Sequence, residues 1–171
     1  MRHILVALLS VLVCSFAAKA MAQNCDSTHI PPQSATKIWH CANASDTVVV
    51  FVHGLHSSTR SAWLRQPQST GGQQVYWPNL VLSDANLKQP SIYLASFYTS
   101  LQATGYGMDD AADELFAQLK TRTGAQAAVL EKKNIFFVAH SLGGILTRKV
   151  LVKYANEFAG KRVGLLLVAS P

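Results

Sequence analysis

The chain has 171 residues, of which 49% are hydrophobic, 14% charged and 9% aromatic. This composition is that of a globular protein and excludes disorder over most of the length. The formal net charge is +6, but the basic residues are scattered in runs no longer than two. The sequence therefore does not indicate a nucleic-acid-binding surface, which usually needs a concentrated basic face.

Residues 1–22 have the pattern of a secretory signal peptide. Arg2 precedes an apolar run from Ile4 to Ala18, and Lys19 is followed by Ala20-Met21-Ala22, a small-x-small tripeptide typical of signal-peptidase cleavage. The apolar run has 15 residues, fewer than the roughly 20 that a membrane-spanning helix needs. We expect export to the periplasm or the exterior after cleavage near Ala22, with an uncleaved anchor as the alternative.

Cys25 and Cys41 are the two cysteines that remain after removal of the first 22 residues. In an oxidising compartment such an even pair favours a disulfide, which would close a loop near the N-terminus of the mature chain. Two unpaired thiols are the alternative, because the sequence does not give the Cα separation that a bridge requires. The disulfide hypothesis thus depends on the export hypothesis.

Residues 23–46 are polar and contain Pro31-Pro32 and the turn-forming cluster 43–46, so we expect an extended N-terminal lead-in there. The pattern changes at Thr47, where an unbroken β-branched and aromatic run from Val48 to Val52 begins and leads into His53-Gly54. Such a run predicts a strand buried on both faces of a parallel sheet. We expect one domain over residues 47–171.

A long connection over residues 53–91 follows this strand. It contains Trp63, Tyr76 and Trp77 and only a modest helical stretch from Asn79 to Leu87. Long connections in compact domains are often lids or binding loops, so the three aromatic side chains are candidates for an apolar, substrate-binding lid. Packing of the same aromatic rings in the core is the alternative, and the sequence favours it.

Three further apolar runs predict strands, and segments with helical spacing separate them. We expect strands at Ile92–Phe97, Ile135–Ala139 and Val163–Ala169, and helices at 112–119 and 142–151. The acidic pair Asp109-Asp110 before the first helix and Lys120 at its end match the helix dipole. This alternation predicts an α/β fold with a doubly wound, mostly parallel sheet and helices on both faces.

Ser141 lies where the strand at Ile135–Ala139 gives way to a helix. Small residues flank it at both second neighbours, Ala139 and Gly143, in the pattern Ala-x-Ser-x-Gly. This is the pattern of a nucleophile elbow, with alanine in place of the usual first glycine, and the serine must then occupy a strained turn whose neighbours have small side chains. We predict that Ser141 is the nucleophile of an acyl-transfer reaction.

His53-Gly54 ends the first predicted strand and begins a loop that can turn an amide toward the serine. In enzymes with a nucleophile elbow, the oxyanion hole combines an amide of such a loop with the amide after the nucleophile. These are the backbone N–H groups of Leu55 and Leu142. We expect His53 to be a hydrogen-bonding residue rather than a base, and His140 to pack beside the serine.

Taken together, these motifs resemble those of α/β-hydrolase serine esterases and lipases, in particular lipases similar to GPI inositol-deacylase and the serine-active-site proteins. The resemblance covers about residues 47–171, and it rests on residues 50–55, Trp63, residues 77–80, 93–98, 139–144 and 165–171. It implies a carboxylic ester substrate, which we expect to be lipid-like, and we expect contact with a membrane surface. It does not identify the acyl chain or the head group.

The resemblance also implies a triad in the chain order Ser, then Asp or Glu, then His. No histidine follows Ser141 in the sequence, and Glu157 is the one acidic residue after it. We therefore expect a C-terminally incomplete domain without the triad acid and base. Without a base, the serine would be a weak nucleophile. His56 is a conceivable surrogate base, whereas Asp109, Asp110 and Asp113 are better explained as charges at a helix N-terminus.

Three hypotheses follow: an exported serine hydrolase of esters, an inactive product that retains a binding groove, and a structural remnant. An apolar sheet edge at Val163–Val168 predicts self-association. We expect no metal and no cofactor, because a serine mechanism requires neither and the histidines lack partners at metal-ligand spacing.

Overall fold

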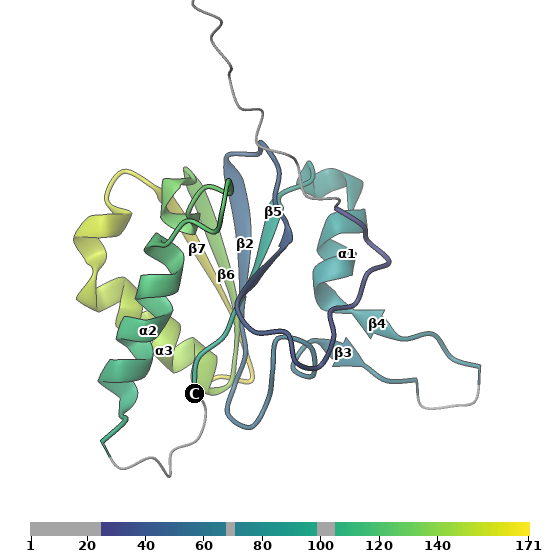
Figure 1. Cartoon of the computed structure of the whole chain (residues 1–171), viewed down its shortest axis with the longest axis horizontal. Helices are drawn as coiled ribbons and strands as arrows, with labels where there is room; N and C mark the ends of the chain where they lie inside the picture. Colours follow the sequence, from purple (N-terminus) through teal and green to yellow (C-terminus); the bar gives the residue numbers. More distant parts are fainter. Residues whose placement is uncertain (1–24, 68–70, 99–104) are drawn as a thin grey trace, which may run out of the picture.

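The computed structural model describes residues 25–67, 71–98 and 105–171 (Figure 1). The predicted signal peptide lies outside the described residues. A five-stranded sheet has the order β1-β5-β2-β6-β7. The strands are β1 (Ile38–Cys41), β2 (Thr47–Val52), β5 (Ser91–Ala95), β6 (Asn134–His140) and β7 (Arg162–Val168). All neighbours are parallel except β1, which runs antiparallel to β5.

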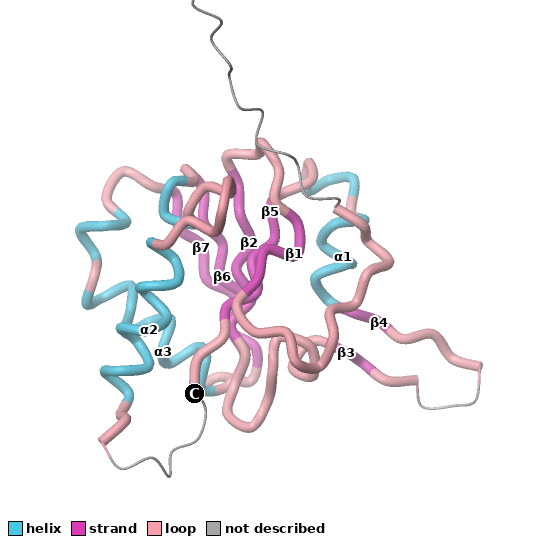
Figure 2. The backbone as a smooth tube through the Cα atoms, in the orientation of Figure 1, coloured by secondary structure: helices cyan, strands magenta, loops and turns pink. Residues whose placement is uncertain are grey.

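Helices lie on both faces of this sheet, as Figures 1 and 2 show. The helices α2 (Met108–Lys120) and α3 (Leu142–Lys153) cover one face, and α1 (Trp77–Ser83) lies on the other. The remaining elements are the short hairpin β3 (Leu64–Arg65) and β4 (Val75–Tyr76) and the 3-10 turns η1 (Ala85–Leu87), η2 (Val129–Glu131) and η3 (Ala155–Phe158). The predicted α/β fold class, with a mostly parallel sheet, is confirmed.

The apolar run of β2 is continuous because both of its faces are covered. Val48, Val50 and Val52 belong to the hydrophobic cluster that includes side chains of α2 and α3. Val49 and Phe51 belong to the cluster on the opposite face, against which α1 packs. Successive side chains of a strand point to opposite faces, so each face receives every second residue of β2.

β1 lies within the segment that we expected to be an extended lead-in. Trp39, His40 and Cys41 are at most 5% exposed, and the strand pairs with β5. A disulfide joins Cys41 to Cys25, with a Cα–Cα separation of 4.7 Å. The lead-in therefore contributes an edge strand to the sheet and is covalently tied to it.

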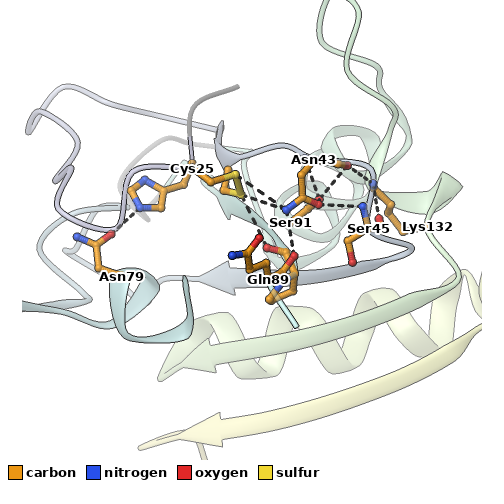
Figure 3. Close-up of a disulfide and its surroundings, with 10 residues drawn as sticks. Cys25, Asn43, Ser45, Asn79, Gln89, Ser91 and Lys132 are labelled. Atoms are coloured by element: carbon orange, nitrogen blue, oxygen red, sulfur yellow. Dashed lines mark hydrogen bonds between the residues drawn. A yellow bond between two sulfur atoms is a disulfide. The ribbon is translucent and has the colours of Figure 1, made fainter. Parts of the chain in front are cut away.

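Asn43 organises the turn between β1 and β2 next to this disulfide (Figure 3). Its side-chain amide donates to the carbonyl of Gln89 at 3.0 Å, and its Oδ1 accepts from the hydroxyl of Ser91 at 2.9 Å. Lys132 Nζ donates to the carbonyl oxygens of Asn43 and Ser45 at 3.0 and 2.6 Å. These bonds satisfy the polar backbone of the turn, which leaves the β1–β2 connection well supported.

β7 forms the opposite edge of the sheet, and its side chains are more exposed than those of β2. Leu165, Leu166 and Leu167 are 37%, 56% and 38% exposed, and Phe136 on neighbouring β6 is 37% exposed. An apolar hollow of about 770 Å³ lies over this part of the sheet and reaches Val81 and Leu87. Among the described residues, no helix is long and apolar enough to span a bilayer.

Candidate active site

Ser141 occupies the sharp turn between β6 and α3. Its backbone has φ 51° and ψ −123°, a conformation that non-glycine residues rarely adopt and that costs about 1–3 kcal/mol. Its N–H donates to the carbonyl of Val168 at 3.0 Å. Its side chain makes no capping hydrogen bond to α3. The hydroxyl is thus not used to hold the helix, and the strain is consistent with a nucleophile elbow.

Two glycines allow the end of β2 to contact the elbow. A Cβ atom on Gly54 would lie 2.9 Å from the Cβ of Ser141 and 3.0 Å from Nδ1 of His140. A Cβ atom on Gly143 would lie 2.6 Å from the carbonyl oxygen of Val52 and would overlap that of His53. Larger side chains would separate the two segments. The loop after β2 and the first turn of α3 therefore meet, as the two sequence motifs require.

Leu142 is the first residue of α3, so its N–H is one of the first amide groups of the helix, which have no intrahelical acceptor. Leu55 follows Gly54 in the loop and is partly buried. The contact between Gly54 and Ser141 brings the backbone of both leucines to the same end of the sheet. Two backbone amides from different elements are the arrangement that can stabilise a developing oxyanion.

His53 is a buried structural residue. Its Nδ1 bonds to the carbonyl of Gly54 at 2.9 Å and its Nε2 to the hydroxyl of Ser96 at 3.2 Å. Its ring stacks on Phe97 with a centroid separation of 4.8 Å. Burial lowers the pKa of His53 and so favours the neutral ring. Because both ring nitrogens are engaged, His53 fits the expected hydrogen-bonding role and not that of a base.

The three aromatic residues of the long connection lie in different surroundings. Trp63 and Tyr76 are each 2% exposed and belong to the hydrophobic cluster beneath α1, where Trp63 packs on Phe51. The hydroxyl of Tyr76 donates to the carbonyl of Thr59 at 2.7 Å. Trp77 is 39% exposed. Core packing accounts for Trp63 and Tyr76, and Trp77 alone offers a surface to a ligand.

The remaining histidines do not bond to Ser141 within the described part of the chain. His56 is exposed and has φ 54°. His140 precedes the serine, and its buried Nδ1 has no hydrogen-bond partner there. Its ring lies edge-on to Trp63, with a centroid separation of 6.2 Å. His140 therefore packs beside the elbow, and neither residue has the geometry of a general base in this structure.

The acidic residues that the sequence analysis considered are engaged in helix contacts. Asp110 accepts from the N–H of Gly107 at 2.7 Å and caps α2. Asp109 and Asp113 pair with lysines of α3, and the Lys153 and Tyr154 side chains lower the pKa of Asp113. Glu157 pairs with Lys120 at 3.3 Å. These carboxylates act in helix packing, and the described residues contain no cluster of three metal-ligating side chains.

Comparison with known proteins places the chain in a family. No curated protein and no solved structure matches the chain. A family model described as "Putative serine esterase (DUF676)" matches residues 42–166. The match includes the loop after β2, Ser141 and all of α3. The chain belongs to the DUF676 family of serine esterases.

Proposed function

We propose that the protein is a carboxylic ester hydrolase of the α/β-hydrolase superfamily, similar to GPI inositol-deacylase-like lipases, and that Ser141 is its nucleophile. The strained backbone of Ser141 carries this proposal. Such strain persists only where the surrounding structure enforces it, and it clusters at functional sites. The position of Ser141 between a parallel strand and a helix N-terminus, together with the esterase family, supports the same reaction class.

In the proposed reaction, Ser141 Oγ attacks the carbonyl carbon of the ester and loses its proton to a base, which then returns the proton to the leaving alcohol; none of the described histidines supplies this base in the present geometry. The carbonyl oxygen becomes an oxyanion, which the N–H groups of Leu55 and Leu142 stabilise. Collapse of the tetrahedral intermediate expels the alcohol and leaves an acyl-serine, which water then hydrolyses. Trp77, as the exposed aromatic residue of the connection, would contact an apolar acyl chain.

Hydrolysis of short and medium p-nitrophenyl esters tests the nucleophile. We expect wild-type activity above background and its loss in Ser141→Ala. Ser83→Ala, an exposed serine at the end of α1, is the matched control and should retain activity. Equal rates in wild type and Ser141→Ala would overturn the assignment of Ser141.

A catalytically inactive domain that acts as a binding module, or a non-functional remnant, is the second candidate. It is favoured by one observation: none of the described histidines bonds to Ser141 in this structure. Added imidazole distinguishes the candidates, because it can replace a missing base. Turnover that appears only with imidazole and requires Ser141 would indicate an assembled nucleophile and oxyanion hole without a base.

The proposal includes export and surface contacts. Cleavage near Ala22 would leave a mature chain whose Cys25–Cys41 disulfide suits an oxidising compartment, and the disulfide supports export. The exposed leucines of β7 support self-association through that edge of the sheet. Contact with a membrane surface would bring the active site to lipid esters. The domain is proposed to span residues 47–171, with β1 as an added edge strand.

A further inference from the structure

One side chain holds both peptide groups that flank Gly54. The hydroxyl of Ser57 accepts from the N–H of Gly54 at 3.1 Å and donates to its carbonyl oxygen at 2.9 Å. The N–H belongs to the peptide group before Gly54 and the carbonyl to the one after it. The two bonds together restrict both backbone dihedrals of a residue that would otherwise be the most permissive type in the loop.

His53 reinforces the second of these peptide groups. A carbonyl oxygen can only accept, so the bond from His53 to the Gly54 carbonyl requires the proton on Nδ1. In the neutral ring, Nε2 is then an acceptor, and the hydroxyl of Ser96 donates to it. The Gly54 carbonyl thus receives two donors, one from His53 and one from Ser57.

Ser96 is in turn held by α2. Its backbone N–H donates to Oε1 of Gln118 at 3.2 Å, and Nε2 of Gln118 donates to its carbonyl oxygen. Gln118 is 4% exposed and His53 is 1% exposed, so the side chains of both residues are largely shielded from water, and shielded polar networks are sensitive to the loss of a member. The network runs from α2, past the end of β5, to the loop after β2.

We propose that Ser57, supported by His53, Ser96 and Gln118, is a positioning residue that orients the N–H of Leu55 toward the oxyanion. A trans peptide is planar, so its N–H points opposite to its carbonyl oxygen. Fixing the Gly54 carbonyl against His53 and Ser57 therefore directs the Leu55 N–H to the other side. This inference rests on the proposed function, in which that amide is an oxyanion donor.

Kinetics of Ser57→Ala on p-nitrophenyl esters test this role. Loss of an oxyanion donor lowers kcat by about 100- to 1,000-fold, and loss of its positioning alone should lower kcat by roughly tenfold with little change in KM. Ser57→Thr, which keeps the hydroxyl, should restore kcat. Ser61→Ala is the control, because that hydroxyl bonds to Ser58 and not to Gly54. An unchanged kcat in Ser57→Ala would overturn the proposal.

The direction of the Leu55 N–H gives a readout that does not depend on activity. Its residual dipolar coupling, measured by NMR on the full chain, should differ between wild type and Ser57→Ala and should be retained in Ser61→Ala. An unchanged coupling would refute the positioning role even if the protein showed no turnover. Ser96→Ala, which removes the donor to His53, provides a second variant should Ser57→Ala not fold. It should shift the Leu55 coupling in the same direction, and an unchanged value there would also refute the proposal.

The two proposals fail in different ways. Absence of turnover dependent on Ser141, together with a shifted Leu55 coupling, would reject the ester hydrolase and retain the role of Ser57 in setting the peptide. Turnover dependent on Ser141 with no response to Ser57→Ala would retain the hydrolase and reject the positioning role.

Discussion

β1 and β7 form the two edges of one sheet, and they differ in length, direction and exposure. β1 has four residues, runs antiparallel to β5, is buried, and is tied to Cys25 by a disulfide. β7 has seven residues, runs parallel to β6, and exposes three consecutive leucines. Exposed sheet edges are sites of unwanted pairing, and short or covered edge strands avoid it. β1 is protected in this way and β7 is not.

Truncation of a buried β1 residue should have the largest effect. Trp39 is 5% exposed and lies edge-on to Tyr93 with a centroid separation of 5.0 Å. We expect Trp39→Ala to lower the free energy of unfolding by about 3–5 kcal/mol, because it removes a large buried ring and leaves a cavity. Urea unfolding followed by circular dichroism measures this. A loss no larger than that of Leu166→Ala on β7 would remove the contrast between the edges.

Reduction of the disulfide should have the next largest effect. Cys25 and Cys41 are 16 residues apart, and a loop of that size corresponds to about 3 kcal/mol of stabilisation in the chain-entropy model. We expect a lower melting temperature with dithiothreitol and in Cys25→Ser/Cys41→Ser. Dithiothreitol should not affect the double variant further. An unchanged melting temperature would show that the Cys25–Cys41 disulfide does not stabilise the fold.

Acid should weaken the β1 edge. Burial lowers the pKa of His40, and a hydrogen bond from its Nε2 to Asn79 only partly opposes this. The unfolded chain then binds a proton more readily than the folded one. The contribution of neutral His40 to the free energy of unfolding is therefore present above the pKa of histidine in the unfolded chain, about 6.5, and is lost as the pH falls below that value. Burial lowers the pKa of His53 as well, so its protonation at acid pH also favours the unfolded chain.

Unfolding free energies of wild type and His40→Gln between pH 8 and pH 5 check this dependence. The variant should lose less stability over this interval, because the buried His40 is gone while the buried His53 remains. Parallel curves for the two proteins would contradict the assignment to His40.

A charge on the β7 edge should have the smallest effect on stability. Leu166 is 56% exposed, so Leu166→Lys should change the free energy of unfolding by no more than about 0.5 kcal/mol. It should reduce self-association, since a lysine on an edge opposes pairing with another chain. Sedimentation velocity over a concentration series measures the association. Equal association of both proteins would show that β7 is not the contact.

The sequence predicts β7 and does not predict β1. β7 is a run of apolar residues long enough to indicate a strand from its pattern alone. β1 has only four residues, and its register shifts between Trp39 and Cys41, which breaks the alternation that marks a half-buried strand. Its partner β5 lies about fifty residues later in the chain, so local sequence carries no sign of the pairing.

The candidate site divides in a similar way. The small residues around Ser141 predict the elbow, and the structure gives this serine a strained backbone next to Gly54. The network from Gln118 through Ser96 to His53 was not predicted, because its bonds join residues 22 and 43 positions apart. Trp63 and Tyr76 were candidates for a substrate-binding lid, but they are buried, as the favoured alternative of core packing predicts.

The sequence by itself determined β2, β5, β6, β7, α2 and α3 and where a serine could stand in a sharp turn, because these depend on periodicity and on side-chain size close to that position. Only the tertiary structure decided that β1 closes one edge, that the Cys25 and Cys41 thiols meet, and that Gln118 and Ser96 reach His53. Each of these depends on distances between residues that the chain itself does not hold together, and such distances are set by packing across the sheet.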